Sequence, residues 1–290
     1  MDNYLKTFRE MISLRGLADH TIKSYSSYLK AYLDYLQHTL NKAPEEVSWE
    51  ELRQYIFYIQ QQRSLADRTI NGHISQLRFF TIYVLHKPWD SYQLPHRKFD
   101  TFLPYVPSRE EVWKFISSMS NLKYKTMVAL MYSAGLRIGE VCHLKYQDIE
   151  RKNKRIQINK SKNRAGRYAL LSEKMLQLLT EYWLAYSKPR GWLFPRPRDL
   201  TKPMYTQTLS RHFNQHRFAN HFNEKLTCHS LKHGFGTHLY EDGVDLLTIK
   251  TLLGHKSINT TTIYISLAIS EVSSVTSPFD TMGGEVDEPK

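Results

Sequence analysis

The sequence predicts a mainly α-helical protein of two domains, the second of which also contains a small β-hairpin. Three features of the 290 residues predict this fold class. Apolar side chains recur every three or four residues in the first part of the chain, as in helices that bury one face. A proline-containing stretch follows, and the second part carries two short strand-like segments that flank a turn sequence.

The first domain, residues 1–88, is expected to be helical. Asp19 is placed to cap the first of its clear apolar stripes. Residues 89–107 contain several prolines, which restrict the backbone and remove hydrogen-bond donors, so we expect an extended linker there. The apolar stripes of the first domain lie at residues 21–36, 49–59 and 66–84.

The second domain, residues 108–270, is expected to have an α+β fold. Ser108 followed by Glu111 fits a capping box at its first helix. The strand-like segments 155–159 and 167–171 are joined by residues that favour a turn, which predicts the hairpin. An acidic tail, residues 271–290, is expected to be flexible unless it docks. Further helices are expected at residues 124–142, with an interruption near Gly135, and at residues 172–186, 205–219 and 229–252.

Positive charge is concentrated in the second domain. The formal net charge is +12, yet Lys and Arg outnumber Asp and Glu by only 11 to 10 in residues 1–90 and by 28 to 13 in residues 91–270. Such an uneven excess indicates a polyanionic partner, and we expect a nucleic-acid-binding face on the second domain.

The composition argues against several other classes of protein. No apolar stretch is long enough to cross a bilayer, and the first residues lack the pattern of a signal peptide. The two cysteines form no CxxC pair and no disulfide framework, so a reducing cytoplasmic location is expected. There is neither a glycine-rich phosphate loop nor a Walker lysine, so nucleotide hydrolysis is not expected.

One segment near the C-terminal end gathers side chains suited to attack on a phosphodiester. His229, Lys232 and His255 precede Tyr264, which follows His255 by nine residues. A phenol loses its proton only near about pH 10, so it is a poor nucleophile at neutral pH. Neighbouring cations can stabilise the phenolate and the charge that develops in the transition state, and this chemistry needs no metal.

A metal site is the alternative for the histidines, because His229, His233 and His238 have a spacing that one helix could use to hold a metal. The chain has no HExxH motif, no clustered cysteines and no carboxylate set of a two-metal nuclease. We therefore expect no metal and no other cofactor. His233 and His238 are interpreted as structural residues that pack or bond to neighbouring backbone.

Five motifs occur in order along the chain: Ala134–Glu140, the lysine-bearing hairpin, His229–His233, Leu252–His255 and Thr260–Tyr264. Together they resemble the tyrosine recombinase (phage integrase) family, in its Xer-like or transposon-borne branch. The resemblance extends from residue 1 to about residue 270. It implies a SAM-like helical DNA-binding domain ahead of a catalytic domain, which together clamp around duplex DNA.

Arg137 has a physical argument of its own beside this resemblance. It follows a Gly-Leu turn in an apolar stretch, where a buried charge is unfavourable unless it meets an anion. Its planar guanidinium can bind two phosphate oxygens. A salt bridge with Glu140, three residues later, is the structural alternative. The resemblance implies that Arg137 is the first catalytic arginine and that Glu140 supports it.

The resemblance also implies roles for the other catalytic candidates. Tyr264 matches the nucleophile, His255 a donor to the phosphate, and His229 a residue that moves a proton or holds the phosphate. Lys162 on the hairpin matches the lysine that protonates the departing 5′-oxygen, and Lys160 is the second choice. A solvated turn lysine is the alternative for either.

Lys232 departs from the family pattern, which has arginine at this position. Lysine keeps the positive charge but loses the planar fork that binds two oxygens at once. We therefore predict that phosphate activation is reduced but not abolished.

The implied activity is site-specific DNA recombination through a 3′-phosphotyrosyl intermediate and a Holliday junction, as in integration, excision, resolution or transposition. The implied partners are double-stranded DNA with an inverted-repeat core site and three further copies of the chain, in a homotetramer on two sites at the nucleoid. Alternatives are a DNA-binding protein of this fold with weakened catalysis and a type IB topoisomerase-like enzyme. DNA contacts are expected from Lys23, Arg68, Arg78, Lys160 and Arg164, with solvated surface as the alternative for the first three.

Overall fold

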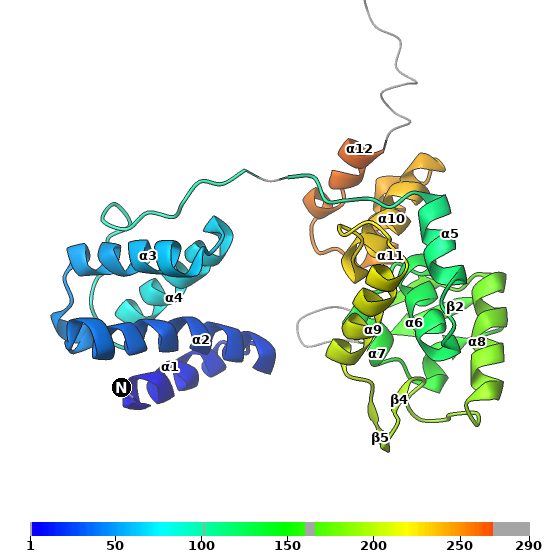
Figure 1. The fold of residues 1–290 in the computed structure, drawn as a ribbon, viewed down its shortest axis with the longest axis horizontal. Coiled ribbons are helices and arrows are strands. Elements are labelled where there is room, and N and C mark those ends of the chain that lie inside the picture. The colour runs from blue at the N-terminus through cyan, green and yellow to red at the C-terminus, as the bar shows by residue number, and fades with distance from the viewer. Residues whose placement is uncertain (1, 101, 160–165, 269–290) are drawn as a thin grey trace, which may run out of the picture. The chain divides into compact units, whose positions relative to one another are not determined.

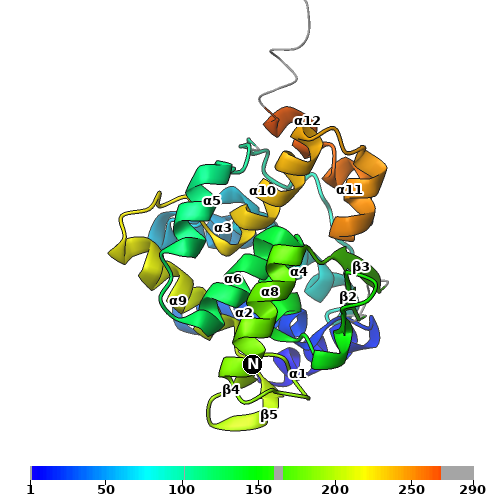
Figure 2. The same ribbon diagram turned by 90° about the vertical axis from the view of Figure 1, so that its right-hand side faces the viewer.

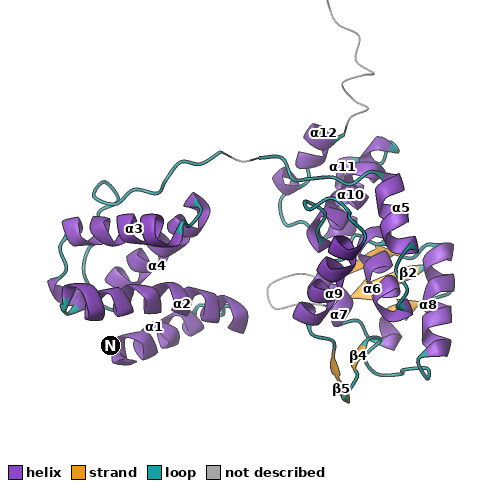
Figure 3. Cartoon of the chain, in the orientation of Figure 1, coloured by secondary structure: helices purple, strands orange, loops and turns teal. Residues whose placement is uncertain are grey.

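The protein is described by a computed structural model that covers residues 2–100, 102–159 and 166–268 (Figure 1). The chain divides into two compact units, residues 1–101 and 102–290. The first unit is helical, and the second adds small antiparallel sheets to its helices (Figure 3). The predicted fold class, a helical N-terminal domain followed by an α+β domain, is confirmed.

The first unit consists of four α-helices and two short helical turns in the part of the chain described. The expectation that Asp19 caps α2 is wrong, because Ala18 occupies the N-cap and Asp19 is the first helical residue. A carboxylate in the first turn still interacts favourably with the helix dipole. The elements are α1 (Asp2–Leu14), α2 (Asp19–Tyr35), a π-helical extension (Leu36–Leu40), a 3-10 turn (Pro44–Glu46), α3 (Trp49–Arg63) and α4 (Asp67–Tyr83).

Aromatic side chains fill the core of the first unit. Tyr32 meets Tyr55 edge-on, and Phe8 meets Phe79 in the same way. The residues that follow α4 pack back onto this unit: Trp89 contacts Trp49 with 5.1 Å between ring centroids. Such edge-to-face pairs hold helices together through both apolar burial and ring electrostatics.

The second unit contains the remaining elements. Ser108 accepts a hydrogen bond from the backbone N–H of Glu111, which confirms it as the N-cap of the first helix of this unit. The Glu111 carboxylate accepts from the Tyr105 hydroxyl, and the reciprocal bond of a capping box is not among the contacts of the described residues. The elements are α5 (Arg109–Ser117), α6 (Leu122–Ser133), α7 (Ile138–Cys142), a 3-10 turn (Tyr146–Asp148), β1 (Ile149–Glu150), β2 (Arg155–Ile158), β3 (Arg167–Leu170), α8 (Glu173–Ala185), β4 (Pro195–Arg196), β5 (Asp199–Pro203), α9 (Thr206–Ala219), α10 (Cys228–Glu241), α11 (Leu246–Leu253), a 3-10 turn (Ile258–Thr260) and α12 (Ile263–Leu267).

The predicted hairpin is the edge of a three-stranded antiparallel sheet in the order β1-β2-β3. Its strands pair in a register that places Ile158 opposite Arg167. A second pair, β4 and β5, was not expected, because each strand contains a proline that disfavours strand pairing.

The helical run expected at residues 229–252 is two helices, and that expectation is wrong. The chain turns at Gly243, which has a φ of +81° that glycine adopts without strain. Asp245 then caps α11 by accepting from the backbone N–H groups of Leu247 and Thr248. The break places the end of α11 beside β3 and α10.

Helix α6 forms the centre of the second unit and packs against α5, α7, α8, α9 and α10 (Figure 2). Nearly all of its apolar side chains are buried. Of the helices in the described ranges, none has the length and apolar character that a membrane span requires.

Candidate active site

A tight turn between α6 and α7 positions Arg137. Gly135 has a φ of +60°, and a Cβ atom there would lie 2.5 Å from the Phe235 ring and 2.7 Å from Leu253. Only glycine allows α10 and α11 to approach this turn so closely. Arg137 is the N-cap residue of α7, and its side chain is 25% exposed, so the guanidinium is partly open to solvent.

Glu140 lies at the centre of a charged network. One guanidinium nitrogen of Arg137 donates to Oε1 of Glu140 at 3.0 Å, and the backbone N–H of Arg137 donates to Oε2 at 2.8 Å. Arg167 donates to both carboxylate oxygens, at 2.8 and 3.0 Å. Burial alone would raise the pKa of Glu140, but the hydrogen bonds and charge of Arg167 and the backbone bond from Arg137 lower it to about 2.

The C-terminal end of α11 collects the cations of the site. Arg167 Nε donates to the Leu252 carbonyl at 2.8 Å. Lys232 Nζ donates to the Leu253 carbonyl at 3.1 Å and to the Gly135 carbonyl at 2.7 Å. The Leu252 and Leu253 carbonyls lie at the negative end of the α11 dipole, which stabilises nearby cations. Lys232 is only 2% exposed, so its ammonium is held deep in the unit.

Three histidines lie around these cations. The rings of His229 and His233 are 4.5 Å apart, edge to face, and Nδ1 of His255 is 3.0 Å from the Thr261 hydroxyl. Burial, followed by the charges of Lys232 and Arg137, lowers the pKa of His255 to about 4. Burial, followed by His229 and Lys232, lowers the pKa of His233 to about 4, and that of His229 is also lowered. His233 and His255 are therefore neutral near pH 7.

Tyr264 is packed among the same rings. The centroid of its ring lies 6.2 Å from the centroid of the His255 ring, and the two ring planes are nearly parallel. The centroid of the His233 ring is also 6.2 Å away. The phenol is 1% exposed and rests on Gly236, where a Cβ atom would lie 2.4 Å from the tyrosine ring. Burial raises the pKa of Tyr264, and the positive charge of Arg137 opposes that shift.

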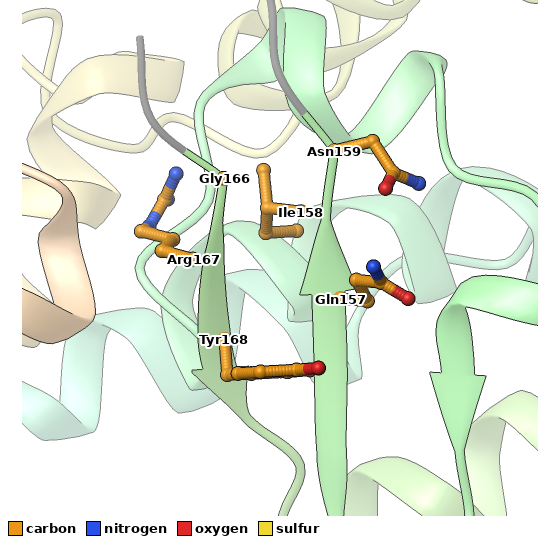
Figure 4. A pocket seen from close by; sticks show the side chains of 6 residues that line it. All are labelled: Gln157, Ile158, Asn159, Gly166, Arg167 and Tyr168. Carbon is orange, nitrogen blue, oxygen red and sulfur yellow. The ribbon is translucent and has the colours of Figure 1, made fainter.

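The hairpin candidates Lys160, Lys162 and Arg164 lie outside the described residues. The base of the hairpin borders a pocket of about 400 Å³. In Figure 4, Arg167 and Tyr168 leave β3 in opposite directions, as successive strand residues do.

The DNA-contact candidates of the first unit are on its surface. Lys23 on α2 and Arg68 and Arg78 on α4 are all exposed. Arg68 lies over the Phe99 ring at 5.3 Å, and Arg78 lines a pocket of about 360 Å³ together with Arg15. Exposed cations of this kind can contact DNA phosphates, and such contacts position a protein on the duplex without reading its sequence.

His233 and His238, interpreted from the sequence as structural, differ in their surroundings. Nδ1 of His238 is 2.9 Å from the Tyr132 hydroxyl, and the two rings also meet edge to face. His233 contacts His229 and Tyr264, and its Nδ1 is buried with no hydrogen-bond partner among the described residues. Within those residues, no group of three or more His, Cys, Asp or Glu could hold a metal ion.

Sequence reasoning did not identify Arg167. Its side chain is 9% exposed, and its ion pair with Glu140, at 2.8 Å, is shorter than the one that Arg137 makes, at 3.0 Å. The available signal was the alternation along β3, which puts Arg167 on the same face as buried Ala169. Tyr168 and Leu170 on the other face are also apolar, so the pattern alone did not say which face is inside.

Two protein-family models match the chain. The model described as "Phage integrase family" matches residues 108–271, and the model described as "Phage integrase, N-terminal SAM-like domain" matches residues 4–91. The protein y4qK of Sinorhizobium fredii is 33% identical over 264 residues, covering 90% of this chain and 84% of y4qK. The tyrosine recombinase XerA of Thermococcus kodakarensis is 25% identical over 271 residues, covering 92% of each chain.

Solved structures share the fold. A lambda integrase dimer bound to a COC′ core site matches with a TM-score of 0.72 and 20% identity, covering 100% of this chain and 99% of that one. XerH recombinase bound to palindromic difH substrate matches with a TM-score of 0.70 and 21% identity, covering 92% of this chain and 82% of that one.

Proposed function

Because the chain belongs to the phage integrase family, we propose that it is a site-specific DNA recombinase that cuts and rejoins strands through a covalent phosphotyrosyl intermediate. The observation that supports this proposal is the gathering of cations around one buried phenol. Arg137 and Lys232 both bond to the Leu253 carbonyl, and His255 stacks on Tyr264. Fixed positive charge in a water-poor site is the arrangement that stabilises a phosphoryl transition state.

In the proposed reaction, the Tyr264 oxygen attacks the scissile phosphorus and its proton passes to His229. The bond from phosphorus to the 5′-oxygen breaks, and Lys162 gives that oxygen a proton. The products are a 3′-phosphotyrosyl bond and a free 5′-hydroxyl. Attack by a partner strand's 5′-hydroxyl reverses these steps, so the ligation needs neither ATP nor a metal ion. Arg137 and His255 bind the non-bridging oxygens throughout.

Tyr264 must move before it reacts, because it is 1% exposed in the free protein. Helix α12, which carries it, has five residues and contacts mainly α10. Short helices with few contacts are held by little free energy. We therefore expect DNA binding to bring α12 away from α10.

The proposed partner is double-stranded DNA with an inverted-repeat core site, bound by a homotetramer that joins two such sites through a Holliday junction. The net positive charge of residues 91–270 supports a DNA partner. Similar folds have been captured on palindromic difH, on a COC′ core site and, for the Tn1549 transposon integrase, on circular intermediate DNA. Integration, excision, resolution and transposition are all compatible with this chemistry.

A nicked suicide substrate tests the proposal. After cleavage, the short fragment that carries the new 5′-hydroxyl diffuses away, so the covalent complex cannot religate and is seen on a denaturing gel. We expect the wild-type chain to be trapped, Tyr264→Phe to give no product, and the matched control Tyr240→Phe to be trapped like wild type. Absence of trapping with intact DNA binding would favour a DNA-binding protein of this fold. Relaxation of supercoiled DNA without joining of two sites would favour a topoisomerase-like enzyme.

We further propose that Lys232 attenuates the enzyme. Its ammonium bonds to two backbone carbonyls, so it adds positive charge to the site without a planar pair of donors for the phosphate. Lys232→Arg should raise the rate of single-turnover cleavage by about tenfold, which corresponds to one charge-assisted hydrogen bond gained in the transition state. An unchanged or lower rate in a variant that melts like wild type would refute attenuation.

A further inference from the structure

We propose that Arg167, the first residue of β3, is a positioning residue that holds Arg137 and His255 in register for binding the scissile phosphate. This assignment rests on the proposed function of the same site. It concerns a residue that reaches the reacting atoms only through its neighbours.

The contacts of Arg167 join three separate segments of the chain. Its two terminal nitrogens donate to the two oxygens of Glu140 on α7, and its Nε donates to the Leu252 carbonyl at the end of α11. The side chain is 9% exposed. A planar guanidinium can make these three bonds at once, whereas the single ammonium of a lysine cannot reproduce their geometry.

The first consequence concerns the charge of Arg137. Glu140 accepts from both Arg137 and Arg167, so two cations share one carboxylate. Because two guanidinium groups share one carboxylate, the cluster of Arg137, Glu140 and Arg167 retains a net positive charge, which attracts an incoming phosphate. Without Arg167, the buried carboxylate would have Arg137 as its main partner and would compete with the phosphate for it.

The second consequence concerns the position of His255. Arg167 passes directly against Gly254, where a Cβ atom would lie 2.7 Å from Arg167 Cδ. Gly254 ends α11 in the left-handed conformation, and His255 follows it. The bond from Arg167 to the Leu252 carbonyl therefore fixes the helix end from which His255 projects. A displacement of about 1 Å in a group that binds the phosphate can lower the cleavage rate by roughly 100-fold.

The test uses the full-length chain and three substitutions. Arg167→Lys keeps the charge, Arg167→Gln removes it, and Arg155→Lys is the matched control. Arg155 lies on the neighbouring strand β2, where it pairs with Glu150 at 2.7 Å and lies over the Tyr168 ring at 3.8 Å, and its side chain is 41% exposed. DNA affinity, thermal melting and single-turnover cleavage of the suicide substrate are measured for each.

We expect both Arg167 variants to bind DNA within about twofold of wild type and to cleave roughly 10- to 100-fold more slowly, with Arg155→Lys unchanged. A purely structural role would lower the melting temperature and DNA affinity together with cleavage, and that result would overturn the assignment.

A charge-neutral double variant provides the sharper readout. If Arg167 acts by neutralising Glu140, the addition of Glu140→Gln to Arg167→Gln removes the competing carboxylate, and the cleavage rate should recover by about tenfold. A double variant that is slower than Arg167→Gln alone would overturn the proposal.

A substrate with sulfur at the bridging 5′ position separates this role from one exerted through the hairpin. A thiolate leaves without needing a proton, so this substrate restores the cleavage rate of variants that lack the general acid. We expect no recovery for Arg167→Lys, and recovery would show that Arg167 acts through Lys162 instead.

If the wild-type chain forms no covalent product, the proposed function falls and this assignment with it. If wild type and the Arg167 variants cleave equally, only the assignment falls.

Discussion

The two units of the protein use positive charge in opposite ways. In the first unit, Lys23, Arg68 and Arg78 are exposed around an aromatic core. In the second unit, two cations of the candidate active site lie inside: Lys232 is 2% exposed and the Arg167 side chain 9%. Each inner cation is bonded to backbone carbonyls or to Glu140, so its desolvation is compensated by specific partners.

This difference separates binding from chemistry. A surface cation is screened by salt and free to move, so it adds affinity for any phosphate backbone with little dependence on geometry. A cation held in a low-dielectric interior interacts more strongly, and its partners fix its direction before the substrate arrives. We infer that substitutions in the first unit change DNA affinity, whereas those in the inner network change the rate of cleavage.

The largest effect is expected when Arg137 is compared with Arg68. Arg137→Ala removes a charged donor to the phosphate and should lower single-turnover cleavage by about 100- to 1,000-fold, with a small change in DNA affinity. Arg68→Ala should weaken binding a few-fold at every DNA sequence and reduce the slope of log affinity against log salt by about one. Gel-shift titrations at several salt concentrations and cleavage under saturating protein measure the two quantities separately.

The proposed difference between the units would be wrong if Arg68→Ala lowered the cleavage rate or if Arg137→Ala lowered the DNA affinity. Slower cleavage by Arg68→Ala at saturating protein would place that side chain near the chemistry. A steep loss of DNA affinity in Arg137→Ala would mean that its guanidinium serves mainly as a binding group.

Local patterns of the sequence account for much of this fold. Ser108 caps α5 as expected, and the strand pair around the hairpin forms because alternating side chains meet a turn sequence. The split of residues 229–252 into two helices was missed, although Gly243 and Asp245 carry the signals for an end and a start. Helical periodicity continues across such a break, so spacing alone does not reveal it.

The site was less accessible from sequence than the fold. The order of motifs selected Arg137, Lys232, His255 and Tyr264, whose contacts the structure then brings into one cluster. The role of Arg167 depends on which face of a short strand is buried, and on a helix end 85 residues away. Such contacts arise from tertiary packing, and no local pattern encodes them.

The second prediction concerns pH and the buried histidines. The pKa values of His233 and His255 are lowered to about 4, mainly by burial and then by neighbouring positive charge. In the unfolded chain they return to about 6.5, so between these values the unfolded state binds more protons than the folded state. Their stabilising contribution is therefore complete above about pH 6.5 and is lost as the pH falls toward about 4.

Because both rings keep partial solvent contact, we expect the loss to be on the order of 3 kcal/mol for the pair over this window. Thermal melting of the double variant His233→Asn/His255→Asn between about pH 7.5 and about pH 4.5 should show a flatter pH dependence than wild type. His20→Asn, in which an exposed histidine of the first unit is replaced, should keep the wild-type slope. Equal slopes in all three proteins would mean that the histidine pair titrates normally.

The smallest effect is expected from a pair of glycines, one in each unit, that contact a tyrosine ring. Glycine inside a helix is usually less stable than alanine by about 1 kcal/mol, so Gly→Ala should stabilise where space allows. A Cβ atom at Gly72 on α4 would lie 3.2 Å from the Tyr28 ring, which can shift slightly, so Gly72→Ala should change stability by less than about 1 kcal/mol.

At Gly236 on α10 the same atom would lie 2.4 Å from the Tyr264 ring, which is enclosed and cannot remain in place. Gly236→Ala should therefore destabilise the second unit by about 1 to 3 kcal/mol, or lower its melting temperature by several degrees, and should push Tyr264 toward solvent. Calorimetry of both variants measures the difference, and nitration of Tyr264 followed by peptide mapping reports its exposure. If Gly236→Ala is as harmless as Gly72→Ala and leaves Tyr264 unreactive, then α12 does not rest on α10 in the free protein, and the nucleophile is held in place by something other than this contact.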